Sequence, residues 1–334
     1  DVETYTWHGK FGKQLVPFML VMHLSGDSEL LSLARNAAIK DKWDVWKGDT
    51  FFVVNPSKGE VGRKFKLFRD NLQKLTTELL WDHYLDNNTH LHDLAVKAGL
   101  VSVNDLTHEL IKAAPVKGRP KFIEVYVVGH NICGFDEIVL AAQVIRNRDE
   151  VLPAFHISRN FMPRNGKILF NDITFGLPNP IYESRKDFTE WERGIKTAKD
   201  SKLQYVKFMV RDTFALTHTS LKNAAKAYDL PVEKGSCPYE AVNDFYRLGS
   251  YLQDSDGFPH VHYWKSSEEY QQNKELWENS KEGAYDIIQH TLSYCAQDVR
   301  VTAALVEKLK ESYRNFIIME VNLPESDFNI FQRP

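Results

Sequence analysis

The 334-residue sequence predicts a sheet domain of the α/β or α+β class. Short runs rich in β-branched and aromatic residues, which favour strands, recur along the chain. Between them lie longer segments whose apolar residues are three or four positions apart, the spacing of an amphipathic helix. Because the two kinds of segment alternate and no internal repeat or low-complexity tract appears, the pattern indicates a central sheet flanked by helices.

The strand-like runs are short and often end at glycine or polar residues. The strongest covers residues 121–128, where Phe, Ile, Val and Tyr precede Gly129, and another at 50–54 consists of Thr-Phe-Phe-Val-Val. We expect strands over residues 1–6, 17–24, 50–54, 121–128, 152–158, 166–175 and 203–212.

Helical spacing is clearest where leucine and phenylalanine recur between residues 65 and 85. After strand 121–128, Ile138, Val139, Ala142 and Ile145 define one face of a further helix. We expect helices over residues 65–85, 91–100, 136–145 and 220–228, and a long C-terminal helix within 282–313. The highly charged stretch 184–202 predicts an exposed loop or a short helix.

Composition limits the class of partner. The chain is 43% hydrophobic and 26% charged with a net charge of −3, so it has no overall nucleic-acid signature. Contact with DNA must then come from a local groove, which argues against a pure binding protein more than against a nuclease, whose metals supply positive charge at the phosphate.

Cysteine spacing and hydropathy indicate the compartment. The three cysteines, Cys133, Cys237 and Cys295, lie far apart without C-x-x-C spacing, which predicts neither a disulfide framework nor a zinc site and suits a reducing compartment. No apolar run approaches the roughly 20 residues of a membrane span. We therefore expect an intracellular protein without a membrane partner.

Four carboxylates carry the functional prediction. Asp1 and Glu3 are two apart on a predicted strand, so both project from one face. Asp136 lies where strand 121–128 gives way to a helix. Tyr294 and Asp298 are four apart on the C-terminal helix and share a face.

Each of these features has a structural explanation when taken alone. A D-x-E pair is common on surface strands, Asp136 is suited to a helix N-terminus, and a half-buried tyrosine above an aspartate is frequent. Together, and in this order, they indicate a two-metal nuclease, which hydrolyses a phosphodiester between two divalent cations. Asp1, Glu3 and Asp298 are expected to bind one cation and Asp1 with Asp136 the other. All-oxygen ligands favour Mg²⁺, or Mn²⁺ in vitro.

Residues beside Asp136 point to the substrate. Asn131 offers an amide that can hydrogen-bond a sugar or base, and Phe135 offers a ring for base stacking. Stacking platforms of this kind are typical of single-strand binding. We expect the substrate to be a single-stranded 3′ end, with the Tyr294 hydroxyl orienting the attacking water.

The motifs resemble the three exonuclease motifs of family B DNA polymerases, and the intervening segments are similar to the protein-primed viral members of that family. The resemblance runs essentially end to end. It implies an RNase H-like 3′–5′ exonuclease fold, with a mixed central sheet flanked by helices and family-specific insertions. It is carried by Asp1-Val2-Glu3-Thr4-Tyr5-Thr6, residues 11–22, residues 211–221, Gly249-Ser250-Tyr251, Asp256-Gly257-Phe258-Pro259 and Asn329-Ile330-Phe331-Gln332-Arg333-Pro334.

The resemblance implies further site residues. Lys234 matches the lysine of a K-x-x-hydrophobic motif that neutralises charge on the scissile phosphate. An S/T-L-x-x-hydrophobic element that holds the frayed strand has two matches, 213–217 with Phe214 in place of leucine, and 220–224 on the following helix. The residues implied to bind nucleic acid are Thr4, Asn131, Phe135, Thr213 and Phe214.

The resemblance also implies a domain arrangement. Residues 1–334 would cover the exonuclease domain, with a core at about 1–24, 116–238 and 283–315 and insertions at about 25–115 and 240–282. The polymerase motifs D-x-x-S-L-Y-P and Y-x-D-T-D-S do not occur. A polymerase palm is therefore expected downstream of Pro334, in a longer protein of which this chain is a piece.

The resemblance also implies that the whole protein replicates a linear double-stranded DNA genome in the host cell nucleus. Its expected partners are DNA, a terminal-protein primer and a viral single-stranded DNA-binding protein. Two alternatives remain: a catalytically silent exonuclease-like scaffold or DNA-binding module, and a stand-alone exonuclease.

Overall fold

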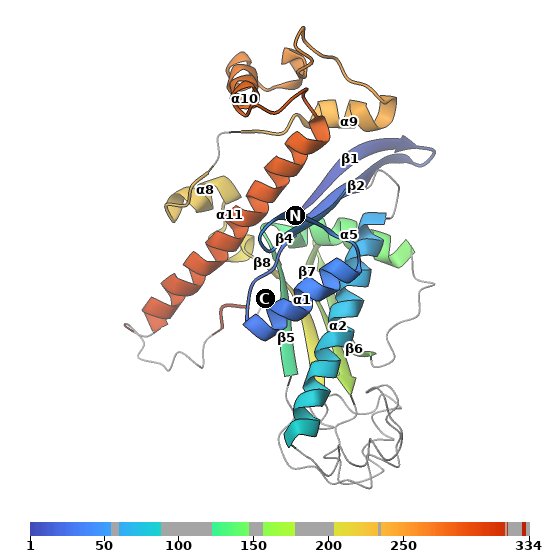
Figure 1. Cartoon of the computed structure of the whole chain (residues 1–334), viewed down its shortest axis with the longest axis vertical. Helices are drawn as coiled ribbons and strands as arrows, with labels where there is room; N and C mark the ends of the chain where they lie inside the picture. The colour runs from blue at the N-terminus through green and yellow to red at the C-terminus, as the bar shows by residue number, and fades with distance from the viewer. Residues whose placement is uncertain are drawn as a thin grey trace.

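The computed structural model contains two four-stranded sheets and several helices, one of which, α11, runs past the first sheet (Figure 1). The structure describes residues 1–54, 60–87, 122–146, 156–177, 204–232, 235–317, 319 and 329–331.

The strands and helices alternate along the described part of the chain, as the sequence predicts. The strands are β1 (Val2–Gly9), β2 (Gly12–His23), β3 (Asp44–Lys47), β4 (Thr50–Val54), β5 (Phe122–Gly129), β6 (His156–Arg164), β7 (Lys167–Leu177) and β8 (Gln204–Asp212). The helices are α1 (Ser28–Lys40), α2 (Glu60–Asn87), η2 (Ile132–Gly134), α5 (Asp136–Arg146), α7 (Phe214–Thr217), α8 (Leu221–Ala227), α9 (Tyr239–Leu248), η3 (Val261–Tyr263), α10 (Ser267–Asn279) and α11 (Ile287–Phe316).

The first sheet is antiparallel, in the order β1-β2-β4-β3. β1 and β2 form a hairpin, in which Val2 lies opposite Leu20 and Gly9 opposite Gly12. Gly12 has φ +106°, a backbone conformation that glycine adopts without strain. The register shifts between Glu3 and Thr4, so a bulge follows the first acidic pair directly.

The second sheet is mixed, in the order β5-β8-β7-β6. β5 is parallel to β8, whereas β7 is antiparallel to both β8 and β6. Since β5 and β8 are parallel and Gly129 lies opposite Asp212, the segments that leave their carboxyl ends start side by side. These segments contain four of the five predicted nucleic-acid-binding residues, namely Asn131, Phe135, Thr213 and Phe214.

Two apolar clusters join the sheets to the helices. One packs β2 and β4 against α1, α2 and α5, with Trp43 and Phe68 rings 5.8 Å apart. The other packs β1 and β2 against α9 and α11; there the Tyr5 and Tyr246 rings stack at 4.5 Å and Phe18 is 1% exposed. The hairpin that carries Asp1 and Glu3 is therefore anchored on both faces.

The structure corrects several boundaries. The expected single central sheet is two sheets, of which only the second is mixed. The strand expected at 152–158 is β6 at 156–164, and the helix expected at 65–85 starts earlier as α2. Helices α1, α9 and α10 and strand β3 were not predicted. Each is short, with 10 to 13 residues in the helices and four in the strand, so few repeats of its period are available. The helix expected at 91–100 and the segment 184–202 lie outside the described residues.

The two segments interpreted as insertions contribute to the core wherever they are described. β4, from the segment 25–115, hydrogen-bonds along β2, and α1 and α2 pack on the same sheet. From the segment 240–282, α9 packs against β1. The physical reason is that β2 needs a partner for its second backbone edge and a cover for its apolar face. Within the described residues, no helix combines the length and apolar character needed to cross a membrane.

Candidate active site: a cluster of buried carboxylates

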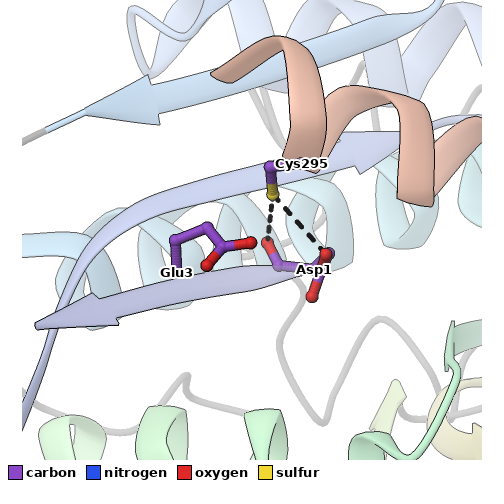
Figure 2. Close-up of side chains that lie close together, drawn as sticks. All are labelled: Asp1, Glu3 and Cys295. Carbon is purple, nitrogen blue, oxygen red and sulfur yellow. Dashed lines mark hydrogen bonds between the residues drawn. The ribbon is translucent and has the colours of Figure 1, made fainter. Parts of the chain in front are cut away.

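Asp1 and Glu3 lie at the start of β1, next to α11. Oxygen atoms of Asp1 and Glu3 and the sulfur of Cys295 all lie within 4.8 Å of one another. Figure 2 shows the Cys295 side chain reaching from α11 toward Asp1, with its thiol 3.6 Å from Asp1 Oδ2. Asp1 is exposed, whereas Glu3 is only 7% exposed.

Asp136 lies next to the same hairpin and belongs to the segment that follows β5 of the second sheet. It begins α5, is 6% exposed, and accepts a hydrogen bond from the Val2 backbone N–H at 3.3 Å. The same N–H donates to Asp1 Oδ1 at 3.0 Å. One amide therefore links the carboxylates of Asp1 and Asp136, two residues that are far apart in the sequence.

Asp298 lies on α11, one turn beyond Tyr294. The Tyr294 hydroxyl hydrogen-bonds Asp298, which lowers the pKa of that carboxyl, although burial raises it more, to about 6. Asp1, Asp136 and Asp298 line one cleft of about 1290 Å³, together with residues of β5. Asp136 and Asp298 do not belong to the tighter group of Asp1, Glu3 and Cys295.

Three of the four carboxylates, those of Glu3, Asp136 and Asp298, are connected by their electrostatics. Burial, followed by the charge of Asp298, raises the pKa of Glu3 to about 8, with a smaller increase from Asp136. Burial also raises the pKa of Asp136, against lowering by the Asp1 amine and the Val2 N–H. The cluster thus holds more negative charge than its surroundings stabilise.

Such a cluster fits divalent cations. Carboxylate oxygens are the ligands that Mg²⁺ and Mn²⁺ prefer, and a cation would offset the repulsion that raises the pKa of Glu3.

Asn131 and Phe135 bracket the short helix η2 on the way to Asp136. Asn131 is exposed and has φ +59°, and its backbone N–H donates to Asp212 Oδ1 at 2.7 Å. A Cβ at Gly134 would lie 2.5 Å from Asn131 Oδ1, so a larger residue there would displace the end of the Asn131 side chain. Phe135 is half-buried and packs on the first apolar cluster.

Thr213 and Phe214 follow β8 and differ in accessibility. Thr213 is 0% exposed, and its hydroxyl lies 2.9 Å from His130 Nδ1, so direct contact with nucleic acid is not open to it in this structure. Phe214 is half-buried, with the His130 ring edge-on at 5.8 Å and the Lys167 ammonium 5.4 Å from its ring centre. An aromatic ring beside a cation suits a base and its phosphate.

The remaining predicted residues are less informative. Thr4 is half-buried on β1, directly after the bulge and opposite Pro17. Ser220, from the alternative match, caps α8 by accepting the Asn223 N–H at 3.3 Å. Lys234 lies outside the described residues.

Sequence reasoning missed two residues of the site. Cys295 follows Tyr294 directly, and burial raises the pKa of its thiol well above its usual value. Tyr239, at the start of α9, hydrogen-bonds Tyr294, with the two rings edge-on at 6.3 Å. The position of Cys295 inside a motif could have drawn attention to it, but no sequence signal linked Tyr239 to α11.

Comparison with known proteins identifies the family. Residues 157–334 match the family model described as DNA polymerase type B, organellar and viral. The chain is 66% identical over its whole length to the DNA polymerase of Bovine adenovirus 2, covering 33% of that protein. It is 60% identical to the DNA polymerase of Canine adenovirus serotype 1, over the whole of this chain and 29% of that protein. It is 57% identical to the DNA polymerase of Human adenovirus C serotype 2, over the whole of this chain and 28% of that protein.

The chain thus spans about a third of the length of the curated relatives that it matches. No solved structure was found to match it. The resemblance to viral family B polymerases is confirmed by these relatives. Because the family model matches more than half of the chain and the relatives are similar to it from end to end, the chain belongs to the organellar and viral type B DNA polymerases.

Proposed function

We propose that this chain forms an RNase H-like domain that acts as a metal-dependent 3′–5′ exonuclease. The observation that carries the proposal is geometric. Asp1 lies close to Glu3, shares the Val2 N–H with Asp136, and lines one cleft with Asp136 and Asp298. Clustered carboxylates with so little compensating charge are costly to a fold unless they serve a site.

The carboxylates would hold two divalent cations, Mg²⁺ or Mn²⁺. Asp1, Glu3 and Asp298 are proposed as ligands of one, and Asp1 and Asp136 of the other. When bound, such cations activate a water molecule and stabilise both the attacking and the leaving oxygen of a phosphodiester. The contact between Asp1 and Asp136 through the Val2 amide supports a shared role for these two residues.

The chain's own residues would orient the reactants. The Tyr294 hydroxyl lies between Tyr239 and Asp298, with both of which it interacts, and is proposed to orient the attacking water beside that carboxylate. Phe214 with Lys167 offers a stacking surface, and Asn131 an exposed amide, to a single-stranded 3′ end. The half-buried Phe135 is proposed to limit the pocket beneath the terminal base.

The relatives suggest the wider context. They are named DNA polymerases and are about three times as long as this chain. We propose that the chain supplies the proofreading part of such an enzyme and that polymerisation takes place elsewhere in the longer protein. Protein priming, contact with a terminal protein and a single-stranded DNA-binding protein, and action in the host nucleus stay predictions.

The test is digestion of a single-stranded oligonucleotide labelled at its 5′ end. We expect the chain to shorten it stepwise from the 3′ end in Mg²⁺ and not in EDTA. The Asp1→Ala, Glu3→Ala double variant should be slower by at least about a hundredfold, since the metals contribute several kcal/mol to transition-state stabilisation. Asp44→Ala, which removes an exposed carboxylate on β3, is the matched control and should digest like the parent.

A silent scaffold would give a different result. If parent, double variant and Asp44→Ala degrade the oligonucleotide equally, the activity belongs to a contaminant and the exonuclease proposal fails. A parent that binds the strand without shortening it in Mg²⁺ or Mn²⁺ would favour a DNA-binding module instead.

A further inference from the structure

Three backbone N–H groups from two different segments converge on the side chain of Asp212, the last residue of β8. Asp212 Oδ1 accepts from Asn131 at 2.7 Å and from Phe214 at 2.9 Å, and Oδ2 accepts from Cys133 at 3.2 Å. The first and third donors belong to the segment that leads to Asp136. The second belongs to the segment that carries the candidate stacking ring.

These donors are the N–H groups that a short helix leaves without a partner at its start. Asn131 is the N-cap of η2 and Thr213 is the N-cap of α7, and neither makes a capping hydrogen bond with its own side chain. The Thr213 hydroxyl lies against His130 Nδ1 and the Gly129 carbonyl instead. Asp212 therefore caps both helices in place of their own N-cap residues.

This arrangement has a consequence for Asn131. An asparagine at an N-cap ordinarily uses its side-chain oxygen to cap the helix. Because Asp212 accepts from the η2 amides, the exposed Asn131 side chain is not committed to capping, and its backbone is held at φ +59°. The amide group can then serve a ligand.

We propose that Asp212 is a positioning residue: its carboxylate fixes the segment 131–136 against the segment 213–217 and so presets the distance between Asn131 and Phe214, the two groups that would grip a single strand. The inference rests on the proposed function, which supplies the ligand, and extends it to a residue outside the predicted motifs. A ligand that meets a preformed pair of contacts does not lose affinity to the ordering of loops. Asp212 would act through the two segments that it caps, since its carboxylate oxygens accept the three backbone N–H groups.

The experiment compares two capping aspartates, Asp212 and Asp286. Asp286 caps α11 by accepting from Ile288 at 2.9 Å and Gln289 at 3.2 Å, so Asp286→Ala removes a cap without touching the two segments. For each Ala variant and the parent, the dissociation constant of a 3′-fluorescein single-stranded oligonucleotide is measured in Ca²⁺, and that of Mn²⁺ without DNA. Melting temperature is recorded for all proteins.

We expect Asp212→Ala to weaken oligonucleotide binding by about tenfold or more through lost preorganisation. Mn²⁺ affinity should change much less, since the Asp212 charge is one of the smaller influences on Asp136. Asp286→Ala should leave both unchanged despite its lowered melting temperature. Asp212→Asn keeps one acceptor oxygen, so its oligonucleotide affinity should fall between those of the parent and Asp212→Ala.

Equal loss of strand affinity in Asp212→Ala and Asp286→Ala would overturn the inference in favour of general stability. So would parental strand affinity in Asp212→Ala. Failure of the proposed function gives a separate result: a parent that shows no metal-dependent digestion but binds the strand in an Asp212-dependent manner keeps Asp212 as a positioning residue of a binding module.

Discussion

At the residue scale, Glu3 is the carboxylate of the site whose charged form is most strongly disfavoured by burial and by neighbouring charges. It is 7% exposed, and both burial and the neighbouring Asp298 raise the pKa of its carboxyl. In the absence of a cation, the folded chain holds a proton on Glu3 that an unfolded chain releases at lower pH. Folding stability is therefore linked to pH through this side chain.

Stability without metal should fall as pH rises from about 4.5 to about 8. The Glu3 carboxyl has an ordinary pKa of 4.5 and a pKa of about 8 in the folded chain, so its favourable contribution is complete below pH 4.5 and is lost as pH passes through 8. Urea unfolding in EDTA at pH 5 to 8.5 measures this. Glu3→Gln cannot titrate and should flatten the profile; parallel profiles for variant and parent would contradict the prediction.

Asp136→Asn should separate metal binding from folding. The amide keeps an oxygen that accepts from the Val2 N–H, so the contact at 3.3 Å can persist. One negative charge is lost from the cluster, and we expect digestion of a single strand to fall by about a hundredfold or more. Slow digestion together with a melting curve close to the parent's would support a role for Asp136 as a metal ligand. Digestion at the parental rate would exclude that role.

At the element scale, the segment between β5 and α5 turns through a narrow space. Gly134 lies where a Cβ would be 2.5 Å from Asn131 Oδ1 and 3.2 Å from its Cγ. A substitution there must move a side chain that is proposed to touch the substrate.

Gly134→Ala should therefore weaken single-strand binding while sparing the core. The displaced group is the end of an exposed side chain, so the expected loss of stability is about 1 kcal/mol or less. Oligonucleotide affinity, measured by fluorescence anisotropy, should fall severalfold. Gly283→Ala, at a position with nothing within 4 Å of an added Cβ, serves as control; equal effects of the two changes would argue against the steric explanation.

The segment around η3 and α10 depends on one phenylalanine. Phe258 is 0% exposed and stacks between Trp264 at 5.4 Å and Trp277 at 5.5 Å, with Tyr285 edge-on at 4.9 Å. This aromatic cluster holds the segment against the start of α11.

Phe258→Ala should cost about 3–5 kcal/mol of local or global stability, because it removes a fully buried ring. Hydrogen exchange should locate the loss in α10 and the first turns of α11. Leu248→Ala removes a side chain that is 73% exposed and should change stability by no more than about 0.5 kcal/mol. An unchanged exchange rate in α10 would contradict the assigned role of Phe258.

At the scale of the whole molecule, the candidate site combines residues from β1 in the first sheet, from α5 after the first strand of the second sheet, and from α11. Its ligands come from a hairpin, a helix start and the middle of a 30-residue helix. A cation that binds all three would add to the apolar packing and to the few hydrogen bonds that already join these elements. Binding to the folded state alone stabilises that state.

Mn²⁺ should therefore raise the melting temperature, and by more at pH 8 than at pH 6. At one hundred times the dissociation constant the gain is about 2.7 kcal/mol, and it decreases at lower pH because Glu3 and Asp298 must release protons to bind. Differential scanning fluorimetry at the two pH values measures it. The Glu3→Ala, Asp136→Ala variant should show no gain, and a pH-independent gain in the parent would place the cation elsewhere.

Sequence analysis predicted most strands, because runs of β-branched and aromatic residues are local signals. It also predicted the four carboxylates, whose spacing reveals which side chains share a face of a strand or helix. It did not predict β3, the division into two sheets or the structural role of 25–115, since these depend on which backbone edges and apolar faces find partners far along the chain. Tyr239 and Asp212 were missed for the same reason.

The sequence by itself determined the family, the order of the motifs and the chemistry of their side chains. Only the tertiary structure decided that the Val2 amide bridges Asp1 and Asp136, that Glu3 is buried beside Asp298, and that Asp212 caps two helices at once. The physical reason is that side-chain type and periodicity are properties of consecutive residues and can be read without the fold. Desolvation, repulsion and hydrogen-bond geometry arise only when distant segments meet.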